Sequence, residues 1–211
     1  MKKRYSILLF IGVLLLCAIV FSDLVVLKLF GLKEIEAFSE KDYSEFVYKM
    51  KEIEGGEASY LISTKEQFET YYSLVASETQ YALTKPIQIL YFEEDKLISF
   101  HSSCNVPLNY WTWKYNWNFE NRFEQYPPKT SDSSISISFE QLQTVYPAFK
   151  KVRKPYTIVV FWTRIIEKQV LEVVEVLTKQ KLLHLSDMDK YQIVFINTDQ
   201  SFIGKVSFEE E

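Results

Sequence analysis

Residues 157–200 place the strongest constraint on the fold of this 211-residue chain. The stretch begins with the apolar, β-branched run TIVVFW, which is typical of a strand buried in a parallel sheet. A helical pattern follows, with apolar residues three and four positions apart from Ile166 to Leu177. A second strand-like run, YQIVFIN, covers 191–197. This order predicts a strand, helix and strand unit inside an α/β domain.

The unit resembles the central strand, helix and strand of the thioredoxin family, in which Phe-Trp at the strand end shortly precedes Cys-x-x-Cys at the helix start. Phe161 and Trp162 match that pattern, but Ile166 and Gln169 stand at the two cysteine positions. The dithiol exchange of the family needs two thiols, one of them activated as a thiolate by the helix N-terminus. The resemblance, over about 138–200, implies a thioredoxin-like three-layer sandwich without a redox dithiol.

The thioredoxin family continues beyond this unit with a cis-proline loop, a hairpin and a last helix. In this chain only SFIGKVSFEEE follows Gln200. Two interpretations of the likeness therefore stay open. One is an incomplete thioredoxin-like sandwich, and the other is an α/β domain that shares only general features with that family.

The N-terminus predicts the location of the protein. The basic tip MKKR at 1–4 precedes an uncharged, mainly apolar stretch at 5–22, and apolar character resumes after Asp23. A span of this length crosses the hydrocarbon core of a bilayer as a helix. Positive charge on the short N-terminal side places that side in the cytoplasm. We therefore expect a single-pass cell-membrane protein with a cytoplasmic tip at 1–4, a transmembrane anchor at 5–27 and an extracytoplasmic C-terminal domain.

Two other interpretations of the N-terminus fit less well. A cleaved signal peptide has the same order of basic and apolar regions, but Val20-Phe21-Ser22 lacks the small residues of a cleavage site. A lipoprotein anchor at Cys17 would follow Leu16, where lipid attachment usually needs a small residue. An uncleaved anchor is therefore our prediction.

Behind the anchor we expect a juxtamembrane helix or stalk over 28–56 and one extracytoplasmic α/β domain over 57–211. The length of the second segment suits a single core. A helix is predicted at 38–54, because cap-like polar residues begin it and Gly55-Gly56 ends it.

Shorter signals predict the remaining elements of the domain. Residues 58–62 have strand character, and residues 63–66 form a capping box for the helix that follows them. Two apolar runs flank a charged turn over 87–100, which is typical of a hairpin. Ser138 and Gln141 cap a further short helix.

The stretch 111–119 has the most unusual composition, because aromatic residues alternate with polar ones throughout it. Alternation with a period of two predicts a strand that has one aromatic face. Exposure of that face would make Trp111, Trp113 and Trp117 candidate binding residues for sugar rings or other planar ligands. Burial would place them in the core, the interpretation that we favour, because each aromatic ring removes a large apolar area from water.

A thiol site is the other candidate in the sequence. Cys104 is the only cysteine outside the predicted anchor, so it forms no intrachain disulfide within the domain and no cysteine-based zinc site. His101 precedes it by three residues, and the two form a candidate base and nucleophile of a lone-thiol enzyme. We favour a structural thiol, because no third, orienting residue is recognisable.

Charge and acidic residues argue against several classes of function. The net charge of −4 is spread along the chain, so we expect no nucleic-acid partner. Asp187, Asp189 and Asp199 do not complete a calcium-loop pattern and are expected to be solvated turn acids. No metal site and no cofactor are therefore predicted.

The sequence thus predicts an anchored binding or scaffold protein of the cell envelope, with an envelope protein as its partner, in preference to an enzyme. Two alternatives remain. One is a lone-thiol redox enzyme that uses Cys104, and the other is a carbohydrate- or envelope-binding module that uses the aromatic stretch 111–119.

Overall fold

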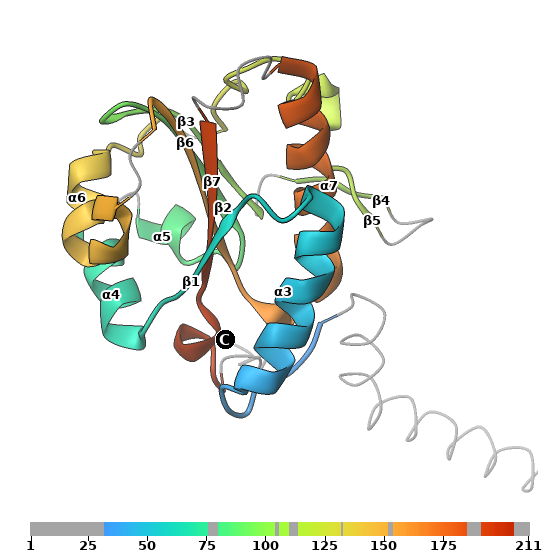
Figure 1. The fold of residues 1–211 in the computed structure, drawn as a ribbon, viewed down its shortest axis with the longest axis vertical. Coiled ribbons are helices and arrows are strands. Elements are labelled where there is room, and N and C mark those ends of the chain that lie inside the picture. The colour runs from blue at the N-terminus through green and yellow to red at the C-terminus, as the bar shows by residue number, and fades with distance from the viewer. Residues whose placement is uncertain are drawn as a thin grey trace, which may run out of the picture.

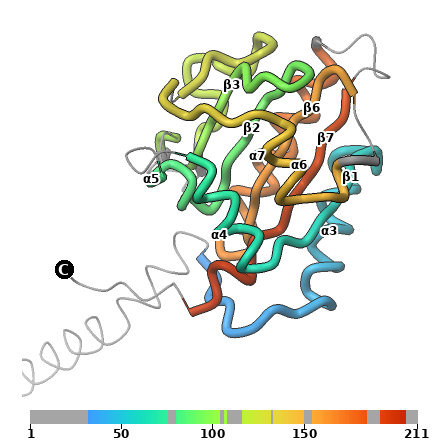
Figure 2. Tube along the Cα trace, turned by 90° about the vertical axis from the view of Figure 1, so that its left-hand side faces the viewer, coloured from blue at the N-terminus to red at the C-terminus, as the bar shows by residue number. Residues whose placement is uncertain are grey.

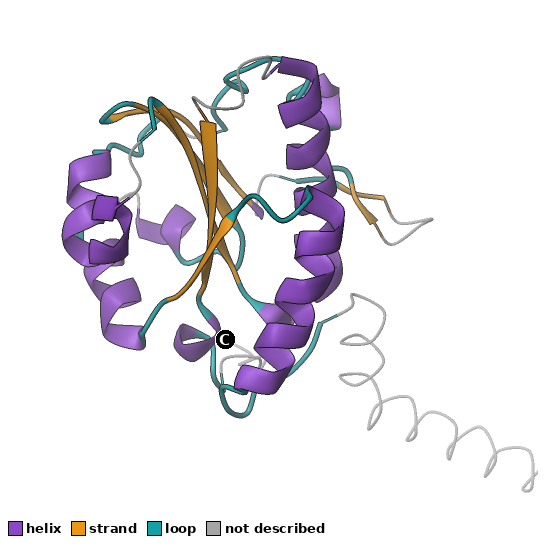
Figure 3. Ribbon diagram, viewed as in Figure 1, coloured by secondary structure: helices purple, strands orange, loops and turns teal. Residues whose placement is uncertain are grey.

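A five-stranded mixed sheet with helices on both faces forms the centre of the domain (Figures 1 and 3). The computed structural model describes residues 32–75, 80–103, 106–109, 114–131, 133–151, 154–184 and 191–204. The strand order is β1-β7-β6-β2-β3. This arrangement confirms the predicted α/β class.

Three neighbouring strands of the sheet pair in parallel, and of the other two only β2 runs against them, because β3 turns back to their direction. The strands are β1 (Ser59–Ile62), β2 (Gln88–Glu93), β3 (Lys96–Ser102), β6 (Tyr156–Trp162) and β7 (Tyr191–Asn197). β1, β7 and β6 pair in parallel, whereas β2 pairs antiparallel with both β6 and β3. Asn197 is in register with both Ile62 and Trp162, so the carboxyl ends of the three parallel strands lie side by side.

The predicted strand, helix and strand unit is confirmed. α7 (Glu167–His184) connects β6 to β7, and its apolar positions Val170, Val173 and Val174 are buried. The predicted hairpin is also confirmed, as β2 and β3. β2 lies between β6 and β3, and all of its residues except the last are buried, as expected for a central strand.

The helices form two layers, one on each face of the sheet. α3 (Glu40–Glu54) and α7 cover one face, while α4 (Lys65–Ser73), α5 (Gln80–Leu83) and α6 (Phe139–Val145) cover the other (Figures 1 and 2). Alternate residues of β6 belong to the two cores: Val160 packs with the α3 and α7 layer, and Val159 and Phe161 with the α4 and α6 layer. This alternation follows from the two-residue period of a strand.

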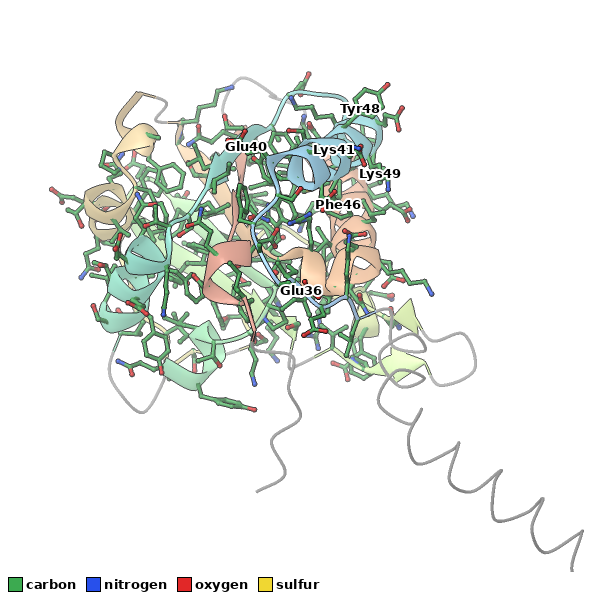
Figure 4. All side chains as sticks on the ribbon, turned by 90° about the horizontal axis from the view of Figure 1, so that it is seen from below. Glu36, Glu40, Lys41, Phe46, Tyr48 and Lys49 are labelled. Atoms are coloured by element: carbon green, nitrogen blue, oxygen red, sulfur yellow. The ribbon has the colours of Figure 1, made fainter. Side chains whose placement is uncertain are left out.

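Helix α3 corrects the predicted domain boundary at residue 57. Its capping agrees with the prediction, since Ser39 accepts a hydrogen bond from the Asp42 N–H and Gly55 ends the helix at φ 89°. However, Phe46, Val47 and Met50 recur at helical spacing and are buried, and α3 packs against α7. Figure 4 shows Phe46 on the inner side of the helix and Tyr48 on the outer side. The helix is therefore part of the domain, and so is the described segment before it, in which Ile35 is buried in the same core.

Capping boxes begin α4 and α6. In α6 the box joins Ser138 and Gln141, as predicted. In α4 it joins Thr64 and Gln67, one residue later than the sequence pattern indicated. The preceding Ser63 is instead buried, and its hydroxyl lies 2.9 Å from the Tyr146 hydroxyl.

The predicted strand over 111–119 is wrong in its second half. A small sheet pairs β4 (Leu108–Asn109) with β5 (Lys114–Tyr115), but residues 116–118 then turn and a short 3-10 helix covers Phe119–Asn121. The Phe119 N–H donates to the Asn116 carbonyl at 3.1 Å, which closes the turn. Asparagine favours such turns, and its positions here interrupt the strand despite the aromatic alternation.

The predicted membrane anchor at 5–27 lies outside the described residues. None of the helices in the described part of the chain has the length and apolar character needed to cross a bilayer.

Candidate functional site

The carboxyl ends of the parallel strands carry the polar groups of the candidate site. In open α/β sheets, ligands bind at this edge, where loops connect strand ends to helix starts. β6 leads through Thr163 into a 3-10 helix at Arg164–Ile166 and then into α7. β7 leads into a second 3-10 helix at Asp199–Ser201. These two short helices bring charged side chains from distant parts of the chain together.

Arg164 and Asp199 form a buried ion pair at this edge. The two side chains are 2% and 0% exposed, and Arg164 Nε donates to Asp199 Oδ2 at 2.5 Å. Asp199 Oδ1 accepts two further hydrogen bonds, from the Thr163 hydroxyl at 2.8 Å and from the Arg164 backbone N–H at 2.7 Å. Such a set of donors compensates for burial of the carboxylate. The prediction that Asp199 is a solvated turn acid is therefore wrong.

The ion pair extends to helix α3. Arg164 Nη1 lies 3.2 Å from Asp42 Oδ2, whose side chain is 48% exposed. Desolvation acts to raise the pKa of Asp42, but hydrogen bonds from Arg164 and Ser39 and the charge of Arg164 hold it below its usual value. The next residue, Tyr43, stacks on Trp162 with ring centroids 6.0 Å apart. Charge and aromatic contact together fix the start of α3 over the end of β6.

A pocket of about 220 Å³ lies beside this network at the start of α7. The side chains that line it are Leu32, Lys85, Pro86, Ser103, Trp117, Ile166 and Gln169. The pocket thus brings together three residues that the sequence singled out separately: Trp117 from the aromatic stretch, and Ile166 and Gln169 from the thioredoxin-like cysteine positions. These three come from segments about fifty residues apart and meet only in the fold.

The chemistry of the pocket is mainly apolar, with a few hydrogen-bonding groups. Trp117 is only 3% exposed, and its indole N–H has no hydrogen-bond partner among the described residues. The Gln169 side chain is also buried and contributes an amide. Lys85 Nζ lies 3.4 Å from the ring centroid of Tyr81, and within the described chain it forms no ion pair. The lining thus offers a ligand apolar surface, an amide and an ammonium group.

Burial of Trp117 confirms the core interpretation at that position. The other two candidate binding tryptophans, Trp111 and Trp113, lie outside the described residues. A sugar platform would need open indole faces, and Trp117 does not provide one.

His101 is a buried core residue on β3. Its Nε2 lies 3.1 Å from the Ser99 hydroxyl, and its ring lies 5.1 Å from that of Phe123 and 6.2 Å from that of Tyr91. Burial, together with the charge of Arg122, lowers the pKa of His101 to about 4. The imidazole is therefore neutral at pH 7. Its proposed thiol partner, Cys104, lies outside the described residues, so the predicted pair of His101 and Cys104 stays a prediction.

A second, larger hollow of about 450 Å³ lies between residues 120–125 and 129–131. All of its lining side chains are polar, among them Glu120, Arg122 and Lys129. Most of these residues are exposed, and none of them was a predicted site residue. We therefore regard the pocket at the start of α7 as the candidate site.

The Arg164 and Asp199 pair was not among the predicted site residues, although the sequence contains two signals for it. Arg164 is a lone charge between the apolar runs of β6 and α7, and Asp199 directly follows β7. Because parallel strands end at the same edge of a sheet, charges placed after them are candidates for contact.

No group of three His, Cys, Asp or Glu side chains in the described part of the chain is placed to hold a metal ion. Neither a protein-family model, nor a curated protein, nor a solved structure matches the chain.

Proposed function

We propose that this chain is a membrane-anchored binding domain of thioredoxin-like architecture that faces the extracytoplasmic side and acts without a redox dithiol. One observation carries the proposal. The two positions that correspond to the thioredoxin cysteines, Ile166 and Gln169, help to line a pocket together with Trp117. An apolar side chain and an amide at these positions provide contacts for a ligand but no thiol for exchange.

The sheet supports the thioredoxin-like part of the proposal. A parallel β6 and β7 pair, joined by α7, is flanked by an antiparallel hairpin on the β6 side. The family has its hairpin after the central unit, whereas here the hairpin formed by β2 and β3 precedes it in the chain. On this view an earlier segment occupies the place that the family's hairpin takes beside the central strand, and the sandwich is a rearranged one.

The membrane part of the proposal rests on the sequence of the N-terminus. The proposed anchor ends at residue 27, and the part of the chain that the structure describes begins at Leu32. Lys33 is already fixed to the domain, since its N–H donates to the Ile165 carbonyl at 2.8 Å. A linker of a few residues would hold the domain close to the membrane, where an envelope protein or a membrane component is the natural partner.

Reduction of insulin by the purified full chain tests the functional claim. We expect a rate at background, because Ile166 and Gln169 stand where the dithiol would be. The Ile166→Cys/Gln169→Cys variant is the matched control, since it supplies both thiols at the helix start. Thiol-dependent turnover by the parent chain that disappears in Cys104→Ser would contradict the proposal and favour the lone-thiol enzyme.

Membrane extraction tests the anchor separately. We expect the full chain to stay in the membrane fraction after high-salt and alkaline washing, because the apolar span at 5–27 would sit in the hydrocarbon core. Recovery of a soluble species that begins after about residue 22 would contradict the anchor.

A further inference from the structure

We infer that the pocket at the start of α7 binds an anionic amphiphile from the membrane, with an apolar chain inside the pocket and an acidic head group beside Lys85. This inference rests on the proposed membrane anchor and names the ligand class of the same site. Three features carry it: the walls of the pocket, its lysine and its position relative to the anchor.

The walls favour a flexible apolar group. Leu32, Pro86 and Ile166 contribute aliphatic surface, and Trp117 contributes an aromatic surface. The volume of about 220 Å³ is smaller than the roughly 300–1,000 Å³ of pockets that enclose whole small molecules. The pocket therefore suits one apolar portion of a larger ligand whose remaining part stays outside.

The lysine of the lining favours an acceptor-bearing, negatively charged head. The Lys85 ammonium group is a cation without an acidic partner in the described chain, and its present contact is the Tyr81 ring. A carboxylate or phosphate at the mouth of the pocket offers acceptors to this ammonium group.

The position of the pocket favours a ligand that comes from the membrane. Leu32 is a wall residue and lies five positions after the proposed end of the anchor at residue 27. Five extended residues span at most about 18 Å. The pocket would therefore lie within this distance of the membrane surface, well within reach of an amphiphile that partly leaves the bilayer.

The surface around the pocket also suits the membrane interface. Tyr81 is 70% exposed next to Lys85, and Ile203 is 40% exposed at the edge where the Gly204 N–H donates to the Ile35 carbonyl. Tyrosine is enriched at membrane interfaces, where lysine keeps its charge in the head-group layer. Glu34 and Glu36 are exposed on the entering segment, so selection of an anion falls to Lys85 and not to a general positive surface.

Tryptophan quenching tests the inference on the full chain in phosphatidylcholine nanodiscs. The probe is 9,10-dibromostearate, because bromine quenches an indole that it contacts. We expect saturable quenching that disappears in Trp117→Phe. Lys85→Gln should weaken the apparent affinity about tenfold, the loss expected for one charge-assisted hydrogen bond. Lys49→Gln, on the exposed side of α3, should bind like the parent. Circular dichroism checks that the variants are folded.

Two further arms identify the source of the ligand and the need for charge. Phosphatidylglycerol with brominated acyl chains, in place of the fatty acid, distinguishes a phospholipid from a free acid; saturable quenching by either supports an anionic amphiphile. The brominated methyl ester has the same chain without the charge, and binding of the ester as tight as that of the acid would overturn the anionic part of the inference.

The failure of the inference differs from the failure of the anchor. A chain that enters nanodiscs but shows no saturable quenching by either anionic probe overturns the inference and leaves the anchor in place. A chain that does not enter nanodiscs overturns the anchor, and the inference with it.

Discussion

Different interactions hold the side chains together at the two ends of the central sheet. At the carboxyl ends of β6 and β7, Arg164 and Asp199 form a buried ion pair, next to the pocket at the start of α7. At the amino ends of the same strands, the first residues Tyr156 and Tyr191 stack with ring centroids 4.7 Å apart. One end therefore depends on paired charges, and the other depends on aromatic packing.

The amino end is a cluster of tyrosines. Tyr126 meets Tyr191 edge to face at 5.4 Å and Tyr156 at 6.0 Å. Tyr91 contacts Tyr126 at 5.8 Å, and its hydroxyl donates to Gln180 on α7 at 2.9 Å. Such ring pairs stabilise the fold only modestly beyond the burial of their apolar area, and most of them tolerate conservative substitutions.

The carboxyl end is less tolerant. Replacing both members of a buried ion pair by apolar residues is often neutral, but removing one member leaves an unpaired buried charge. Such a pair contributes little net stability, yet it fixes which elements meet. The end of the sheet that carries the candidate site is therefore also the end whose geometry depends on individual charges.

The largest effect is expected from Arg164→Met, which removes the partner of the fully buried Asp199 carboxylate. We expect a loss of about 3–5 kcal/mol in the free energy of unfolding, measured by chemical denaturation. The double variant Arg164→Met/Asp199→Asn should recover part of it, because no buried charge remains. A loss below about 1 kcal/mol in the single variant would show that the two ends of the sheet do not differ in this way.

The next largest effect is expected in the pH dependence of stability and comes from His101 on β3. Its pKa of about 4 in the folded chain lies below the ordinary value of 6.5, so the unfolded chain binds the proton first as pH falls. Stability should therefore be unaffected above pH 6.5, decrease between pH 6.5 and 4, and lose on the order of 3 kcal/mol in total. Denaturation at several pH values measures this, and His101→Phe should remove that part of the pH dependence. If the stability of the variant decreased by the same amount over this pH range, the pH dependence would belong to other groups.

At the tyrosine end we expect smaller effects from hydroxyl removal. Tyr91→Phe should cost about 1–2 kcal/mol, because it leaves the buried Gln180 carbonyl oxygen without its donor. Tyr126→Phe is the matched variant. The Tyr126 hydroxyl is buried without a partner among the described residues, so its removal should be neutral or stabilising. Equal losses in the two variants, measured by the same denaturation assay, would contradict this description of the cluster.

The smallest effect is expected from Asp42→Asn. The carboxylate is half exposed and contacts the outer side of Arg164, so water replaces it readily. The unfolding midpoint should stay close to that of the parent and far above that of Arg164→Met. A change as large as that of Arg164→Met would mean that the helix α3 contact, and not Asp199, carries the network.

Local signals in the sequence predicted much of the fold. The β-branched run of β6, the helical spacing in α7 and the cap residues of α3 each act within a few residues, and the structure contains all three elements. The failures concern contacts between distant segments. Nothing local to α3 shows that Phe46 meets Trp162, with ring centroids 5.3 Å apart.

The candidate site was predictable only in pieces. Trp117, Ile166 and Gln169 were each singled out, but their shared pocket depends on how the chain folds back on the start of α7. The Arg164 and Asp199 pair spans 35 positions and depends on the parallel register of β6 and β7. The aromatic alternation failed beyond Tyr115 because the turn at 116–118 takes precedence over a two-residue period.

In the proposed arrangement, the carboxyl end of the sheet lies next to the membrane and the tyrosine end lies away from it. Helix α7 runs from one end of the sheet to the other, and its 18 residues span about 27 Å. Labels at its two ends therefore differ in their distance from the membrane. Lys168 and Leu182 are both exposed, one at each end of this helix.

The most direct test measures how strongly spin-labelled lipid head groups quench a fluorophore at each end of α7. The fluorophore is attached at Lys168→Cys or at Leu182→Cys in a full chain that also carries Cys17→Ser and Cys104→Ser. The labelled chain is placed in nanodiscs that contain the spin-labelled lipids. We expect strong quenching at position 168 and weak quenching at position 182. Equal quenching at the two positions, or stronger quenching at position 182, would contradict this arrangement.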